Sequence, residues 1–210
     1  MIKAVIFDMD GVLVDAKEWH YQALNKALGL FGLEISRYDH LTTFDGLPTK
    51  IKLDMLSVVS GLPTKLHPFI NEMKQQYTMD LVYQYCKPVF VHQYALSNLK
   101  LLGYSLAVAS NSIRNTVEVM MQKADLLQYL DLILSNQDVV NGKPSPEIYI
   151  TAINKIGILP DEALVVEDNE NGIKAALASG AHLLKVDKIE DVTLDSILST
   201  IDKVNKGLLT

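Results

Sequence analysis

Short apolar runs, separated by stretches with helical spacing, restrict the fold of this chain more than any other feature. Residues 4–7 form a continuous apolar run that ends abruptly in acidic residues. Such runs suit strands that are buried on both faces, as in a parallel sheet covered by helices. Similar runs cover residues 106–109, 132–134, 164–166 and 183–186, and helical patterns cover 93–102, 115–123, 146–156 and 171–178. This alternation predicts an open, mostly parallel α/β sheet of the Rossmann-like type.

A long segment without any strand-like pattern separates the first apolar run from the second. Apolar residues recur at helical spacing over residues 17–31, and further helical stretches are expected over 49–59 and 63–84. We therefore predict an inserted helical domain over residues 15–87. The α/β core domain would then consist of residues 1–14 and 88–210.

Composition excludes several classes of protein. The chain has 210 residues, of which 49% are hydrophobic, so it can bury a sizeable core. Its 19 basic and 25 acidic residues give a net charge of −6, with no basic tract, which argues against a nucleic-acid partner. The single cysteine, Cys86, suggests a reducing compartment and is expected to pack in the interior. The apolar runs are too short for a signal peptide or a membrane span, so we expect a cytoplasmic protein without membrane association.

Polar residues follow the predicted strands where ligands bind in open α/β sheets, at the strands' carboxyl ends. Asp8 and Asp10 follow the first strand, and their spacing lets both side chains point into one pocket. The loop 142–146, with the sequence Gly-Lys-Pro-Ser-Pro, presents Lys143. The other strand ends supply Ser110, Asn111 and Ser112, and then Glu167 and Asp168.

Each of these features alone has an ordinary structural explanation. An Asp-x-Asp can end a strand in water, a serine after a strand can cap a helix, and Glu-Asp can complement a helix dipole. Together, in this order and at strand ends, they indicate a site instead. Carboxylates gathered in one place repel one another, and oxygen ligands of this kind suit Mg²⁺.

The combined motifs resemble the four signature motifs of the haloacid dehalogenase (HAD) superfamily. The helical segment after the first motif resembles that superfamily's type-1 cap, and the whole chain is most similar to the β-phosphoglucomutase-like phosphatase branch. The resemblance implies that Asp8 is the nucleophile and Asp10 the general acid and base. It also implies that Ser110, Asn111 and Lys143 bind the phosphoryl group.

The same resemblance implies a Mg²⁺ site. Asp168, the Asp8 carboxylate and the Asp10 backbone carbonyl match the metal-binding positions of the superfamily, and Glu167 matches an indirect ligand. The implied reaction is hydrolysis of a small phosphate ester, such as a sugar or polyol phosphate, through an aspartyl-phosphate. The sequence leaves the oligomeric state open, and a monomer is compatible with it.

Substrate selection is expected in the cap. His20 matches a histidine of the mutase branch, although an ordinary helix histidine fits equally well, and Gly46 resembles the glycine of the cap specificity loop. Thr49, Lys50 and Lys52 could reach a polar substrate, with exposure to solvent the expected state of each lysine. We therefore place Gly46, Thr49 and Lys50 with His20 as candidate substrate contacts.

Two departures from the branch favour hydrolysis over a phosphosugar mutase, which stays open as an alternative. The mutases carry a threonine after motif one and an arginine in the cap loop, where this chain has Ala16 and Thr49. A bisphosphorylated intermediate would lack that guanidinium clamp. A receiver-like phosphoacceptor domain is a further, non-enzymatic alternative, but it would have no helical insertion after its first strand. Asp10 argues against a phosphonate-cleaving enzyme, and Mg²⁺ dependence would separate a phosphatase from a dehalogenase.

Overall fold

The computed structural model describes residues 1–44 and 47–208, which form two compact units. One unit contains Met1–Asp15 and Lys87–Thr210, and the other contains Ala16–Cys86. These boundaries lie next to those expected from the sequence. Within the described residues, no helix is both long enough and apolar enough to cross a membrane.

The first unit is built on a five-stranded sheet in which every neighbouring pair of strands is parallel. The strands are β1 (Ala4–Phe7), β2 (Ser105–Ala109), β3 (Leu132–Leu134), β4 (Ala163–Glu167) and β5 (His182–Lys185), in the order β3-β2-β1-β4-β5. The central strand β1 is fully buried, as expected for a continuous apolar run covered on both faces. The predicted Rossmann-like α/β fold is confirmed.

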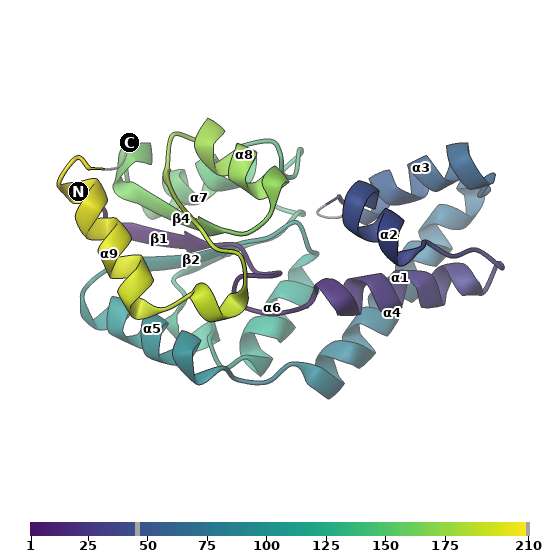
Figure 1. The fold of residues 1–210 in the computed structure, drawn as a ribbon, viewed down its shortest axis with the longest axis horizontal. Coiled ribbons are helices and arrows are strands. Elements are labelled where there is room, and N and C mark those ends of the chain that lie inside the picture. The colour runs from purple at the N-terminus through teal and green to yellow at the C-terminus, as the bar shows by residue number, and fades with distance from the viewer. Residues whose placement is uncertain (45–46, 209–210) are drawn as a thin grey trace. The chain divides into compact units, whose positions relative to one another are not determined.

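Helices cover both faces of this sheet (Figure 1). They are α5 (Phe90–Leu101), α6 (Arg114–Lys123), α7 (Glu147–Ile156), α8 (Glu170–Ala178) and α9 (Leu194–Asn205), with short 3-10 turns at Leu127–Tyr129, Pro160–Glu162 and Ile189–Asp191. Helices α5 and α9 pack together on one face, and α7 and α8 pack on the other. This gives the three-layer arrangement expected of crossovers between parallel strands.

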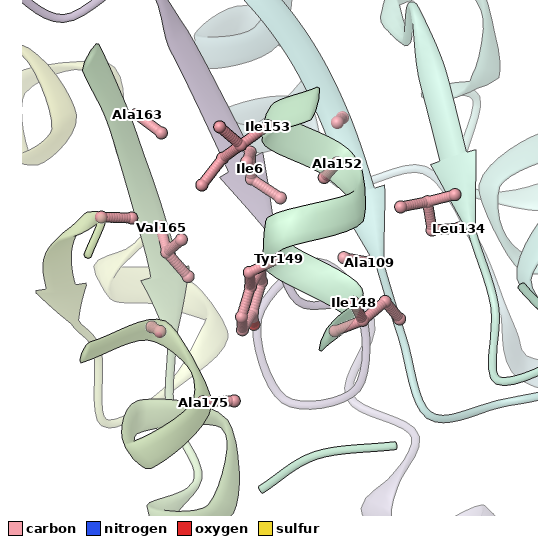
Figure 2. Close-up of a cluster of buried hydrophobic side chains, with 13 residues drawn as sticks. Ile6, Ala109, Leu134, Ile148, Tyr149, Ala152, Ile153, Ala163, Val165 and Ala175 are labelled. Carbon is pink, nitrogen blue, oxygen red and sulfur yellow. The ribbon is translucent and has the colours of Figure 1, made fainter. Parts of the chain in front are cut away.

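Small residues let α7 approach the sheet closely (Figure 2). Ala107 and Ala109 on β2 and Ala152 on α7 are fully buried beside Ile6 of β1. The same cluster contains Tyr149, whose ring is completely buried near the start of α7. Packing on this face therefore places the first turn of α7 near the carboxyl ends of β1 and β4.

The second unit is helical. It contains α1 (Lys17–Gly29), α2 (Arg37–Asp39), a π-helical turn at His40–Phe44, α3 (Thr49–Ser60), a 3-10 turn at Thr64–Leu66 and α4 (His67–Tyr85). Helices α1 and α4 pack along each other, and the apolar residues of the unit form their own core: Leu24, Ala27, Leu28, Ile35, Phe44, Leu53, Leu56, Leu62 and Ile70. Cys86, at the end of α4, is buried, as expected.

The predicted elements match the structure apart from their ends, and the segments that were not predicted include, besides the short 3-10 turns, α9 and the residues Arg37–Phe44. No helix was expected after residue 178, yet α9 begins at a Thr193 cap whose hydroxyl accepts a hydrogen bond from the Ser196 backbone. None was expected over Arg37–Phe44 either, where the structure has a short helix and a π-helical turn.

Candidate active site

Asp8 lies directly after β1, where the ladder with β4 continues through a bond from the Asp8 backbone N–H to the Val166 carbonyl (3.0 Å). The chain then turns sharply: Gly11 has φ +90°, and its N–H donates to the Val14 carbonyl (2.8 Å). A positive φ of this kind is a conformation that glycine adopts without strain. The turn leaves Asp8 almost fully buried and turns the Met9 side chain into the core.

Lys143 lies between two carboxylates. Its Nζ is 2.6 Å from Asp8 Oδ1 and 2.6 Å from Glu167 Oε1, and its side chain is only 4% exposed. A buried ammonium needs such partners, because burial of an unpaired charge is very costly. The structure therefore brings together the ends of β1 and β4 and the predicted lysine loop.

Asn111 holds that loop in place. Its amide donates to the Lys143 carbonyl (3.2 Å) and accepts from the Lys143 backbone N–H (2.9 Å). Gly142 passes so close that an added Cβ would lie 2.7 Å from Asn111 Oδ1. The side chain of Asn111 thus positions Lys143, and its predicted contact with phosphate stays a prediction.

Glu167 is fully occupied by hydrogen bonds within the sheet unit. Besides Lys143, Oε1 accepts from the hydroxyl of the buried Tyr149 (2.8 Å), while Oε2 accepts from the backbone N–H groups of Asp168 (3.0 Å) and Asn169 (3.2 Å). This carboxylate rests against the first turn of α8, where a Cβ at position 172 would overlap it. A side chain at position 172 would therefore force the Glu167 carboxylate or the helix to shift.

Asp8, Glu167 and Asp168 form an acidic cluster that could hold a divalent cation. One carboxylate oxygen from each lies within 4.8 Å of the others. Because both oxygens of Glu167 accept hydrogen bonds from protein donors, Asp8 and Asp168 are the better-placed direct ligands. Hard oxygen donors of this kind suit Mg²⁺.

The electrostatics of the site follow from this crowding. Burial raises the pKa of the Asp8 carboxyl well above its usual range; Lys143 opposes that shift, and the charges of Glu167, Asp10 and Asp168 add to it. For Lys143, burial alone would lower the pKa, but Asp8 and Glu167 raise it overall, so the ammonium stays protonated. The carboxyl groups of the cluster thus outnumber the one ammonium beside them.

Two serines lie at the same edge of the sheet. Ser110 is buried at the end of β2, and its hydroxyl accepts from the Ser112 backbone N–H (3.0 Å). The Ser112 hydroxyl donates to Asp10 Oδ2 (3.1 Å). The structure therefore places Asp10 and Ser110 in the neighbourhood that their motifs predicted.

The candidate substrate residues belong to the helical unit. His20, on α1, has its Nδ1 3.2 Å from the Nζ of Lys74, a buried residue of α4. Thr49 is the first residue of α3 and is partly exposed, and Lys50 is exposed. Gly46 lies outside the described residues. The expectation that Lys52 is exposed to solvent was wrong, because Lys52 is buried, with only 9% of its surface exposed.

Comparison with known proteins agrees with this geometry. The sequence profile described as haloacid dehalogenase-like hydrolase matches residues 5–186. The chain belongs to this family. A "Phosphorylated carbohydrates phosphatase" from Thermotoga maritima is 28% identical to this hydrolase over 182 residues, which cover 85% of this chain and 82% of the relative. A "Phosphoglycolate phosphatase" from Aquifex aeolicus is 28% identical over 179 residues, with the same coverage of each chain.

Solved structures share the fold of this hydrolase. A β-phosphoglucomutase from Clostridium difficile has a TM-score of 0.84 at 21% identity, with 99% of each chain covered. CbbY from Rhodobacter sphaeroides, solved in complex with phosphate, has a TM-score of 0.76 at 24% identity and covers 88% of this chain and 86% of its own. The predicted HAD superfamily is confirmed, and the phosphatases among its relatives support the predicted enzyme class of a phosphoric monoester hydrolase.

Two residues that shape this site were not predicted to do so. Tyr149 lies in a helical pattern where a buried aromatic residue is ordinary core, and Gly172 is one glycine in the helix after the fourth strand. Only the direction of the Glu167 side chain shows why both matter.

Proposed function

We propose that this hydrolase is a Mg²⁺-dependent phosphatase that cleaves a small phosphate monoester through an aspartyl-phosphate at Asp8. The observation that carries the proposal is the buried Asp8 carboxylate, 2.6 Å from the Lys143 ammonium and within 4.8 Å of Asp168 and Glu167. Such a carboxylate can act as a nucleophile only where positive charge offsets an incoming phosphate. At ~4 Å and an effective dielectric of ~20, one carboxylate and a phosphate dianion repel by roughly 8 kcal/mol.

In the first step, a carboxylate oxygen of Asp8 attacks phosphorus, and the bond between phosphorus and the ester oxygen breaks. Asp10 gives its proton to the leaving oxygen, which departs as an alcohol. Lys143 and the Ser110 hydroxyl contact the phosphoryl oxygens, whose charge is redistributed in the transition state. Covalent catalysis of this kind divides one difficult displacement into two easier ones.

In the second step, Asp10 acts as a base. It takes a proton from water, whose oxygen attacks phosphorus, and the bond to Asp8 breaks. Inorganic phosphate leaves, Asp8 is regenerated as a carboxylate, and Asp10 is again protonated. The Ser112 hydroxyl, 3.1 Å from Asp10 Oδ2, orients this carboxyl group within the sheet unit.

The donor set fits a hard divalent cation, with Asp8, Asp168 and the Asp10 backbone carbonyl as the proposed ligands. Mg²⁺ would supply the positive charge that keeps Asp8 ionised and offsets the charge of the phosphate. The high pKa of Asp8, caused first by burial and then by the neighbouring carboxylates, supports this need. Glu167 contributes indirectly, because it holds Lys143 and two backbone N–H groups.

We propose a sugar or polyol phosphate as the substrate, and the helical unit as the cap that selects it. The named relatives act on phosphorylated carbohydrates and phosphoglycolate, which are small monoesters. His20, Thr49 and Lys50, together with Gly46, are the proposed selecting residues. The absence of an arginine at position 49 favours hydrolysis over a mutase.

The test is release of inorganic phosphate from a panel of sugar, polyol and carboxylic acid phosphates, with and without Mg²⁺. We expect metal-dependent release from one chemical group of esters and none by Asp8→Asn, because a carboxamide is not a competent nucleophile. Turnover by Asp8→Asn at the wild-type rate would refute the assignment. Conversion of β-glucose 1-phosphate to glucose 6-phosphate without free phosphate would instead establish the mutase.

A further inference from the structure

We infer that the Tyr149 hydroxyl is a positioning group that occupies Glu167 and thereby leaves the Lys143 ammonium available to Asp8 and the phosphoryl group. The inference rests on the proposed function, which assigns no role to Tyr149. It concerns one oxygen atom, Glu167 Oε1, which accepts hydrogen bonds from both Lys143 and Tyr149.

Tyr149 makes polar contacts through both its hydroxyl and its ring. Its side chain has no exposed surface, and its hydroxyl oxygen lies 2.8 Å from Glu167 Oε1. The Nζ of Lys143 lies 4.7 Å from the centroid of its ring. One side chain therefore touches both members of the ion pair, the carboxylate through its hydroxyl and the ammonium through its ring.

Lys143 is held by two competing acceptors at the same distance of 2.6 Å. In a buried site, an acceptor with fewer donors attracts an ammonium more strongly. By donating to Oε1, the Tyr149 hydroxyl reduces the pull of Glu167 on Lys143. The two backbone N–H groups on Oε2 have the same effect on the other oxygen.

The α8 helix closes one side of the Glu167 carboxylate. Its carboxylate packs against the backbone of α8 at Gly172, where even a methyl group would overlap it. Burial raises the pKa of Tyr149 well above its usual range, and the charge of Glu167 raises it further, so the phenol remains a donor. Loss of the hydroxyl would therefore strengthen the hold of Glu167 on Lys143.

The variant Tyr149→Phe isolates this effect, because the ring and its contact with Lys143 remain. Using p-nitrophenyl phosphate as the probe, we expect kcat to fall about tenfold and KM to change less than twofold, as for loss of one hydrogen bond to a charged group felt in the transition state. Tyr104→Phe is the matched control, because Tyr104 lies directly before the amino end of β2, whereas the candidate site lies at the carboxyl ends of the strands. Thermal unfolding of both variants shows whether Tyr149→Phe is folded.

A double variant separates positioning from packing. In a Glu167→Gln background, the neutral amide does not compete for the ammonium, so Tyr149→Phe should lower kcat less than twofold further. An independent readout is inhibition by orthovanadate, which should weaken about tenfold in Tyr149→Phe but not in Tyr104→Phe.

The outcomes distinguish the two proposals. An equal loss of kcat in both backgrounds, or a rise in KM at unchanged kcat, overturns the positioning role. A Tyr149→Phe enzyme with wild-type kcat and vanadate inhibition overturns this inference alone. If the wild type releases phosphate from neither p-nitrophenyl phosphate nor the ester panel, the proposed function is overturned, and this inference with it.

Discussion

The sharpest structural prediction concerns Gly172, in the first turn of α8. An added Cβ at this position would lie within 3.0 Å of all three atoms of the Glu167 carboxylate, a separation that real Cβ atoms do not show. In Gly172→Ala, Glu167 must therefore leave its place and lose Lys143, Tyr149 and two backbone donors. Loss of one partner from a buried ion pair costs about 3–5 kcal/mol.

We expect Gly172→Ala to unfold at a temperature lower by roughly 10 °C, on the scale of ~2–4 °C per kcal/mol for chains of this size. Phosphatase activity should fall with it, because Lys143 loses an anchor. The assays are thermal unfolding and phosphate release. Gly29→Ala is the matched control: Gly29 ends α1, nothing lies within 4 Å of its added Cβ, and alanine there should be neutral or slightly stabilising.

The collision itself can be tested with Glu167→Ala, which removes the carboxylate that the methyl group would meet. In that background, Gly172→Ala should cost less than about 1 kcal/mol, because coupled neighbours are not additive. Full stability of the single Gly172→Ala variant would contradict the reasoning. So would a penalty of equal size in both backgrounds.

Three further outcomes are expected. Asn111→Ala should lower the free energy of unfolding, measured in urea, by about 1–3 kcal/mol, because two hydrogen bonds to the Lys143 backbone are lost. The kcat of this variant should fall as well. Burial raises the pKa of the Asp138 carboxyl, but hydrogen bonds from Ser135 and Arg114 lower this pKa overall. The ionised carboxylate therefore stabilises the folded state above the unfolded pKa of ~3.9, and this stabilisation is lost as pH falls through the lower folded pKa. Asp138→Asn should therefore be less stable than wild type at pH 7, and the difference in urea midpoint should shrink towards pH 3. Chelation with EDTA should abolish phosphate release, and added Mg²⁺ should restore it, whereas activity that survives chelation would contradict the metal requirement.

The fold could be predicted because its strands are continuous apolar runs that stand out from the helical patterns around them. A strand buried on both faces needs a continuous apolar run, and the runs around residues 4–7 and 164–166 lie in β1 and β4. The meeting of the candidate site residues could be predicted for a related reason. Parallel strands all end at one edge of the sheet, so Asp8, Lys143 and Glu167 meet there although they are distant in sequence.

Side-chain direction could not be predicted in the same way. Tyr149 and Lys52 lie in helices, where periodicity indicates which face is buried but not which polar atom a buried group meets. Helix α9 was missed for a different reason. The sequence contains its Thr193 cap and its apolar spacing, but no functional motif lies in this segment. The role of Gly172 was the hardest to predict from sequence, because it depends on the position of the Glu167 carboxylate, which comes from β4.

Charge balance explains why Glu167 and Asp168, adjacent in sequence, have different tasks. Four carboxylates and one ammonium leave the site strongly negative before any phosphate arrives. By committing both oxygens of Glu167 to Lys143, Tyr149 and backbone donors, the fold neutralises one acid without a metal. In the proposed mechanism a divalent cation would offset Asp8 and Asp168, and Asp10 would carry the proton that it donates in the first step. A phosphate dianion would then meet offset charges only where the cation and the protonated Asp10 are both in place.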